Sequence, residues 1–370
     1  MEIDRRSLML AASAGFAYAG LPFAVHASQN PDTTVALCGR KPDGKDYAFF
    51  GKIGGSLRSV ALPERGHSPV FSPSGRRVAF PARRPGLFML IADTTGAGPD
   101  QWFASPAGRH FCGHGVFINE TTVITTENDY EAGRGVLGIW DLTTGKRIGE
   151  FDSHGVGPHD ILPRQGGRTL VVANGGILTH PDTGRAKLNI PTMRPNLSIV
   201  DSETGELLDQ VEPPAPLHKV SLRHIAVPKD DLVVVGGQYQ GPESDNPSLI
   251  AVWRPGNALA FVPMDEQDTR ALNHYCGSVM ASPSAEYAVV TSPRGSVAHF
   301  ISLGDEPELL DTIMLTDVCG AAAVADDTFV LTSGQGDFLS VQIRPDGTLR
   351  RRDLRPPLLA QWDNHARTFI

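Results

Sequence analysis

Five histidines recur along the chain where short apolar runs begin, and they are His67, His114, His159, His224 and His365. Imidazole is the commonest ligand of transition metals, and carboxylates complete many iron and manganese sites. An acidic pair, Glu127 and Asp129, ends a neighbouring apolar run. We therefore predict a shared metal site with these ligands: His114, Glu127, Asp129, His159, His224 and His365. We expect less from His67, because Ser68-Pro69 alters the backbone that follows it.

A second polar group ends the apolar runs that follow the histidines. It is predicted to bind a ligand and consists of Arg84, Asn174, Gln238, Tyr239 and Arg294. The planar guanidinium of Arg84 or Arg294 suits bidentate contact with a carboxylate or phosphate. The alternative for both arginines is a salt bridge to Glu127 or Asp129.

Each of these residues also has a purely structural interpretation. A histidine at a strand start can hydrogen-bond within its own sheet and bind nothing. The four cysteines, Cys38, Cys112, Cys276 and Cys319, form no C-x-x-C pair, so they do not indicate a zinc ribbon or a thioredoxin-like site. They are either soft ligands, disulfide partners or small buried hydrophobes. No phosphate-binding glycine loop or serine-nucleophile motif is present.

The elements that position these residues form a repeat. An apolar strand ending in Asp, followed by a turn with Thr-Gly, occurs at 89–96, 138–145 and 198–205. Such a repeat of short strands, with a period of about 40–50 residues, is typical of a β-propeller. Seven strand starts can be aligned, at 66–71, 113–117, 158–162, 223–227, 276–280, 319–323 and 363–365. The sequence therefore predicts an all-β, seven-bladed propeller.

Ring closure and one insertion complete this prediction. The last strand start lacks its own following strands, and the N-terminal runs at 34–37, 47–50 and 57–62 can supply them. We expect the strand near His365 to pair with the strand near Val35, which leaves no open seam. The Pro- and Gly-rich segment 177–196 lengthens one repeat and is expected to form a loop on one face.

The N-terminus indicates export. Residues 1–27 carry Arg5-Arg6, a short apolar stretch and Val25-His26-Ala27, as in a twin-arginine signal peptide, which leaves 28–370 as the propeller. The stretch is too short for a stable membrane span, so we expect release into the periplasm without membrane insertion. The formal net charge of −8 and the absence of a basic run argue against a nucleic-acid partner.

Several motifs resemble those of one family. They are Thr126-Glu127-Asn128-Asp129-Tyr130, Gly157-Pro158-His159, Val172-Ala173-Asn174-Gly175-Gly176, Gln238-Tyr239-Gln240-Gly241, Thr291-Ser292-Pro293-Arg294-Gly295 and Trp362-Asp363-Asn364-His365. The chain resembles, over nearly its whole mature length, an uncharacterised family of twin-arginine-exported propellers, domain of unknown function fifteen-thirteen. Its members tend to be encoded beside imelysin-type and di-haem oxidoreductase proteins, which implies periplasmic iron uptake and iron-uptake or redox partners. The resemblance supplies no catalytic residues.

Three functions are compatible with these observations. The first is a periplasmic propeller that binds a transition metal, iron above all, or a metal-containing ligand at a channel mouth lined by histidines and carboxylates. The second is a metal-dependent hydrolase or oxidoreductase at the same mouth, with Glu127 or Asp129 as the base. The third is a docking scaffold for a redox partner.

Overall fold

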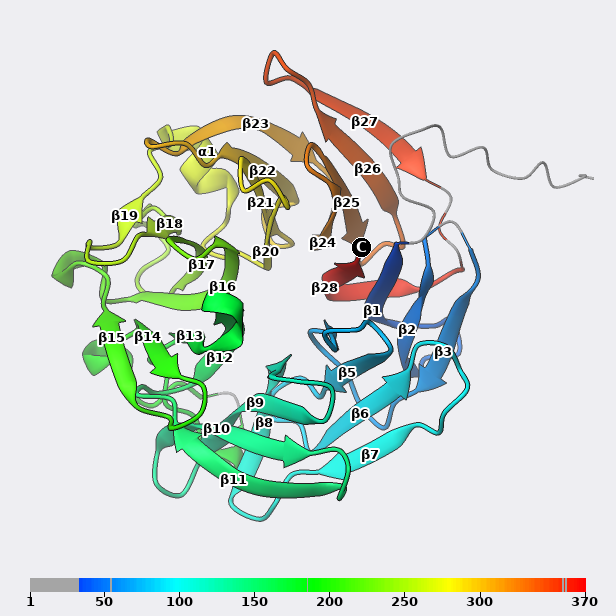
Figure 1. Cartoon of the computed structure of the whole chain (residues 1–370). Coiled ribbons are helices and arrows are strands. Elements are labelled where there is room, and N and C mark those ends of the chain that lie inside the picture. Colours follow the sequence, from blue (N-terminus) through cyan, green and yellow to red (C-terminus); the bar gives the residue numbers. More distant parts are fainter. Residues whose placement is uncertain (1–32, 54, 185, 355, 357) are drawn as a thin grey trace, which may run out of the picture.

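Seven four-stranded antiparallel sheets are arranged in a ring around a common axis (Figure 1), the position that is called the central channel in β-propellers. The computed structural model describes residues 33–53, 55–184, 186–354, 356 and 358–370. The proposed signal peptide, 1–27, lies outside the described residues. The prediction of an all-β, seven-bladed propeller is confirmed.

The innermost strand of each blade lines the channel, and consecutive innermost strands contact one another around the ring. In ring order they are β28 (Gln361–Phe369), β4 (Val70–Phe71), β8 (Arg109–Phe117), β12 (Pro158–Arg164), β16 (Val220–Lys229), β20 (Ser278–Ala281) and β24 (Val318–Ala325).

The second and third strands of each blade are rich in β-branched and aromatic residues, which suits strands buried on both faces. The second strands are β1 (Thr34–Arg40), β5 (Arg77–Pro81), β9 (Thr122–Asp129), β13 (Thr169–Asn174), β17 (Leu232–Tyr239), β21 (Tyr287–Ser292) and β25 (Thr328–Ser333). The third strands are β2 (Asp46–Lys52), β6 (Phe88–Asp93), β10 (Arg134–Asp141), β14 (Asn196–Asp201), β18 (Ile250–Trp253), β22 (Val297–Ser302) and β26 (Phe338–Ile343).

The outermost strands are more exposed and more polar. They are β3 (Leu57–Ala61), β7 (Gln101–Ala104), β11 (Lys146–Asp152), β15 (Leu207–Val211), β19 (Ala260–Phe261), β23 (Glu308–Met314) and β27 (Leu349–Leu354). The apolar core therefore lies between neighbouring sheets, as where Val289 and Phe300 of one blade pack with Phe329 and Leu331 of the next.

Strand β28 closes the ring. It pairs antiparallel with β1, with Val35 opposite Thr368 and Leu37 opposite Ala366, as the sequence predicted. Trp362 on β28 packs edge-on against Phe49 and Phe338, with ring centroids 5.3 and 5.5 Å away. A blade built from both ends of the described chain leaves no unpaired edge at the seam.

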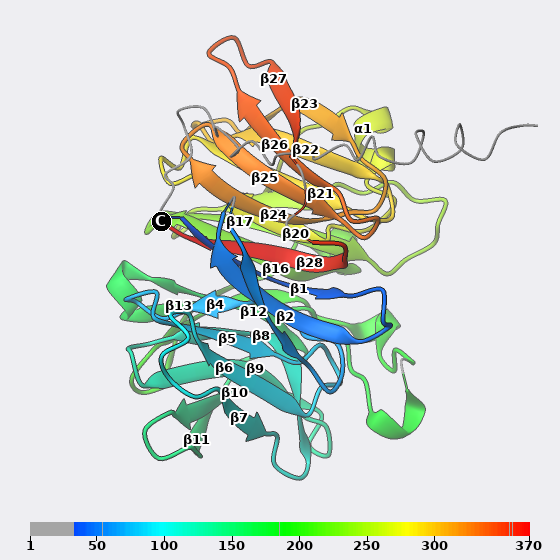
Figure 2. The ribbon, with the colours of Figure 1, turned by 90° about the vertical axis from the view of Figure 1, so that its right-hand side faces the viewer.

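Helices are few and short among the described residues. They are α1 (Glu266–Ala271) and the 3₁₀ turns η1 (Gln165–Gly167), η2 (Pro181–Thr183), η3 (Ile190–Thr192) and η4 (Ala215–Leu217). The predicted insertion lies between β13 and β14, carries η2 and η3, and projects from one face of the ring (Figure 2).

No helix within the described ranges has the length and apolar character needed to cross a membrane.

Candidate metal centre in the channel

Local irregularities of the innermost strands aim the histidines at the channel. The pairing register shifts between Phe111 and Gly115 on β8, between Pro158 and Asp160 on β12, and between Leu222 and His224 on β16. A β-bulge inserts an extra residue and turns the neighbouring side chains. His114, His159 and His224 lie within or beside these bulges.

His365 occupies the corresponding bulge of β28, where the register with β1 also shifts. Its backbone is in the left-handed region, with φ of 70°. A non-glycine residue is disfavoured there, and such conformations persist mainly where the surrounding structure imposes them, often at functional sites.

His67 reaches the same place from the segment before β4. Its backbone N–H donates to Pro81 O at 3.0 Å. Gly113, which precedes His114, has φ of 101°, and a Cβ added there would lie 2.5 Å from Cδ2 of His67. The glycine therefore makes room for the His67 ring.

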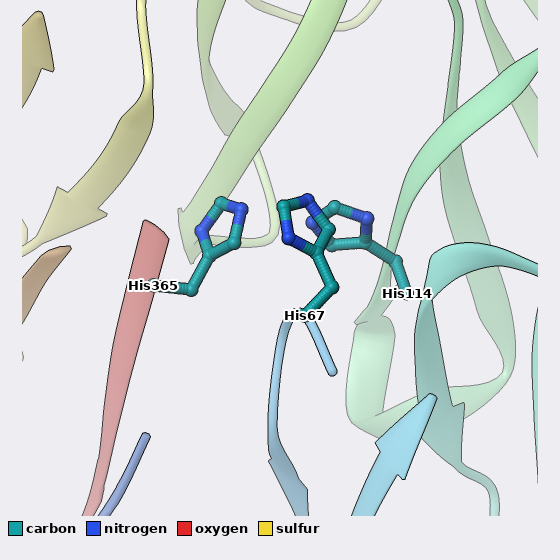
Figure 3. Close-up of side chains that lie close together, drawn as sticks. All are labelled: His67, His114 and His365. Carbon is teal, nitrogen blue, oxygen red and sulfur yellow. The ribbon is translucent and has the colours of Figure 1, made fainter. Parts of the chain in front are cut away.

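The five imidazoles form one contiguous cluster. Both His67 and His114 have their ring centroids within 6.5 Å of the other four, and the shortest separation is 4.5 Å, between His224 and His365. Figure 3 shows the rings of His67, His114 and His365 projecting into the same space. Two triplets have ligand atoms that all lie within 4.8 Å of one another: His67, His114 and His365, and His114, His159 and His224.

The cluster is buried inside the channel and is held neutral. His67, His114, His224 and His365 are at most 3% exposed, and His159 is half-buried. Burial lowers the pKa of His114 to about 4. Burial first, and then neighbouring histidines and arginines, holds the pKa of the other four well below the usual value. Neutral imidazole keeps a lone pair, which coordination requires.

Most of the buried imidazole nitrogens have no hydrogen-bond partner among the described residues. Both nitrogens of His114 and of His224, Nδ1 of His67 and Nε2 of His365 are unpaired. One exception is Nδ1 of His365, which lies 3.3 Å from Ser278 Oγ. Buried polar atoms are almost always paired, so this concentration of unpaired nitrogens within one cluster is unusual.

Among the residues that the structure describes, one carboxylate borders the cluster. Asp160 Oδ1 is 3.8 Å from Nε2 of His114. Both oxygens of Asp160 already accept backbone N–H groups, from Ile161 at 2.9 Å and Ile225 at 3.1 Å. Asp160 therefore supplies negative charge beside the imidazoles from a fixed position.

The predicted acidic ligands are not brought to this cluster. Glu127 is fully buried, accepts from Trp140 and Thr125, and pairs with Arg147 of β11 at 3.0 Å. These contacts direct its carboxylate toward the outer strands of its own blade. Burial raises the pKa of Glu127, and Arg147 opposes that rise.

Asp129 is likewise held outside the cluster. It pairs with Arg109 at 3.0 Å and with Arg134 at 3.4 Å. The salt bridge that was the alternative for Arg294 is not among the ion pairs of these two acids.

The predicted ligand-binding group is divided. Asn174 is fully buried within its blade, where Nδ2 donates to Ser153 O and Asn196 Oδ1 at 2.9 Å. Tyr239 donates its hydroxyl to Asp245, while Gln238 is buried and forms a backbone bridge with Tyr275. Arg294 lies over the ring of Tyr275, with Cζ 4.9 Å from the centroid. Arg84 lies near His110 and contributes, after burial, to lowering the pKa of His110 to about 4.

The cysteines contribute no ligand to the cluster. All four are buried and unpaired, and burial raises the pKa of each thiol. Cys319 occupies the bulge of β24, at a position equivalent to the histidines, but its Sγ faces the carbonyl oxygens of Trp362 and Asp363 at 3.3 and 3.4 Å.

Fold and site together define a seven-bladed β-propeller with a cluster of five histidines at its centre, four of them buried. The chain belongs to the family described as "Protein of unknown function (DUF1513)", which matches residues 60–369. No curated protein matches the chain.

Solved structures share the fold. A chain of "Crystal Structure of Mitotic Checkpoint Complex" superposes with a TM-score of 0.60 at 13% identity, covering 84% of this chain and 87% of that one. "Kuenenia stuttgartiensis Hydrazine Synthase" gives a TM-score of 0.59 at 12% identity, covering 91% of this chain and 100% of that one. At such identities the similarity shows the propeller fold alone.

Proposed function

We propose that this protein binds a divalent transition metal ion inside its channel through the imidazoles of His67, His114, His159, His224 and His365. The observation that carries the proposal is the set of buried, partnerless nitrogens on His114 and His224. A dry, empty site would leave these nitrogens unsatisfied, at a cost of about 1–3 kcal/mol for each group.

The geometry supports this with small adjustments. Two nitrogens that share one ion at about 2.0–2.1 Å lie at most about 4.2 Å apart. Within each triplet, the donor atoms lie within 4.8 Å of one another. Modest rotations of the rings therefore suffice, and the two triplets share His114.

The donor set favours a class of metal. Imidazole suits iron, copper, nickel and zinc, whereas manganese and magnesium prefer oxygen ligands. The family resemblance favours iron. Asp160 is not counted as a ligand, because both of its carboxylate oxygens already accept backbone N–H groups. We propose iron, copper, nickel or zinc, with a role in periplasmic metal uptake that rests on the twin-arginine sequence and the family resemblance. Hydrolysis is less well supported, because Arg147 holds the candidate base Glu127 elsewhere.

The test is metal binding by purified, metal-stripped protein. Titration with Fe²⁺, Cu²⁺, Ni²⁺ and Zn²⁺ should raise the melting temperature for at least one ion, because binding at 100-fold excess over Kd adds about 2.7 kcal/mol to the native state. The double variant His114→Leu/His224→Leu should lose this response. The matched control is His218→Ala, because His218 is a partly exposed histidine that directly follows η4. This variant should retain the response.

Two results would overturn the proposal. One is the absence of a thermal response to all four ions together with no bound metal by elemental analysis. The other is a response that survives in the double variant, which would place the metal outside the channel and leave a docking role as the better explanation.

A further inference from the structure

Cationic side chains near the channel have no acidic partner. Arg223 of β16, Arg294 after β21 and Lys187 of the insertion form no ion pair with any described residue. Arg223 directly precedes His224, and its Nε is buried without a hydrogen-bond partner. Arg223 as a whole is partly exposed, so the unpaired buried atom is Nε, and such an atom is unusual because buried polar groups are normally bonded.

Three different blades bring these cations together. Nη1 of Arg223 lies against the backbone of Gly175, 3.4 Å from where a Cβ would be. Arg294 lies over Tyr275, whose hydroxyl accepts from Asn364 at 3.0 Å, next to His365. Lys187 is anchored by the side-chain carbonyl of Gln240.

Lys187 belongs to the insertion between β13 and β14, which projects from one face of the ring (Figure 2). Arg223, Arg294 and Arg84 are all close enough to act electrostatically on Lys187. These groups therefore form one positive region, which we call the cationic mouth and define by Arg223, Arg294, Lys187 and Arg84.

Positive charge also borders the histidines beyond this mouth. Arg367, two residues after His365 on β28, acts electrostatically on His114, His224 and His365, and it has no ion pair among the described residues. Asp160 is the one carboxylate of the described ranges that contacts the cluster. A bare metal cation would add to this positive charge in a poorly solvated place, where repulsion is weakly screened.

We propose that the channel binds its metal together with a small oxyanion, a carboxylate or a phosphate, which Arg223 holds beside the ion. This rests on the proposed function, because the metal is the second partner of the anion. A guanidinium presents two parallel N–H donors to such an anion. Arg294 and Lys187 raise the local anion concentration at the entrance.

The test measures coupling between metal and anion. Co²⁺, whose visible spectrum reports its ligands, is titrated into metal-stripped protein in chloride buffer alone, with malonate, or with inorganic phosphate, at calculated free Co²⁺. We expect at least a tenfold tighter Co²⁺ affinity with one oxyanion and a changed visible spectrum. Linkage requires that Co²⁺ tighten the binding of that anion by the same factor.

Variants assign the effect to the mouth. Arg223→Met should abolish the enhancement while binding Co²⁺ in chloride at least as tightly, because a positive charge beside the cation is gone. Arg223→Lys keeps the positive charge but loses the paired N–H donors of the guanidinium, so it should retain part of the enhancement. Arg350→Met, on the exposed outer strand β27, should behave as wild type.

The outcomes separate the two proposals. Co²⁺ affinity that is equal in all three buffers overturns the oxyanion and leaves the metal site standing. An enhancement that persists in Arg223→Met also overturns it. No Co²⁺ binding in any buffer overturns the coupled metal–oxyanion site, whereas the metal site itself is decided by the titration with Fe²⁺, Cu²⁺, Ni²⁺ and Zn²⁺. An enhancement with only malonate or only phosphate identifies the class of anion.

Discussion

Two buried histidines of this protein differ only in whether their nitrogens are bonded. His299 on β22 is fully buried, and its ring nitrogens contact Thr312 Oγ1 at 2.8 Å and Asp268 O at 3.0 Å. His224 is equally buried, and neither nitrogen has a partner. The hydrogen bonds of His299 raise the free energy of unfolding, whereas the unpaired nitrogens of His224 lower it when no ligand is bound.

Leucine at these two positions should therefore act in opposite directions. His224→Leu should raise the free energy of unfolding of the metal-free protein by about 1 kcal/mol or more, because an unsatisfied polar group is replaced by an apolar one. His299→Leu should lower it by about 1–3 kcal/mol, since two bonded partners are left unsatisfied. Urea unfolding of metal-stripped protein measures both. A loss of stability in His224→Leu as large as in His299→Leu would show that His224 is an ordinary core residue.

The sequence identified four of the five clustered histidines, because they recur at blade spacing before apolar runs. It gave His67 less weight because Ser68-Pro69 follows that residue, whereas Gly113 of the next blade provides the room that the His67 ring needs. Glu127 and Asp129 could not be placed correctly from spacing. The face on which a strand residue lies depends on the register, and the β8 bulge between Phe111 and Gly115 changes that register.

At the scale of elements, β28 has two roles. It closes the ring by pairing with β1, and its bulge carries His365. The closure was predictable because the repeat lacked strands at one end and had spare strands at the other. The bulges were not predictable from the sequence, because no residue pattern marks them apart from the glycines near some of them.

Trp362 anchors this closing strand, and it is 3% exposed. Trp362→Ala should destabilise the protein by about 3–5 kcal/mol, because it empties the space between Phe49 and Phe338. Trp102→Ala, at a half-exposed position on the outer strand β7, is the matched control and should cost less. Denaturant midpoints give the comparison. Equal costs for the two tryptophans would mean that the seam of the ring carries no special share of the stability.

At the scale of the whole molecule, the neutral histidines make stability depend on pH. Their pKa values lie below 6.5 in the folded protein, and that of His114 is about 4. Below pH 6.5 the unfolded chain binds protons that the folded protein does not, so the stabilisation is complete above that pH and is lost as pH falls toward about 4.

Each such histidine contributes a slope of about 1.4 kcal/mol per pH unit in this range. The unfolding free energy of the metal-free protein should therefore fall steeply between pH 6.5 and pH 5. His114→Leu/His224→Leu should flatten the slope by about 3 kcal/mol per pH unit, since two protons are removed from the balance. Urea titrations at pH 7, 6 and 5 measure both slopes. A wild-type curve that is flat across this interval would contradict burial of neutral imidazoles in the channel.

Because the cysteines form no disulfide, a metal ion bound by the clustered histidines would be a cross-link between blades. All four thiols are unpaired, so no covalent staple joins one blade to another. An ion held by His67, His114 and His365 would tie three blades at a single point, across segments as distant in sequence as β28 and the start of β4. Such a tie acts like a reversible disulfide that closes very long loops, where the entropy removed from the unfolded chain is greatest. Release of the metal would then loosen the ring, so the fraction of protein with bound metal and the resistance of the protein to proteolysis would rise and fall together.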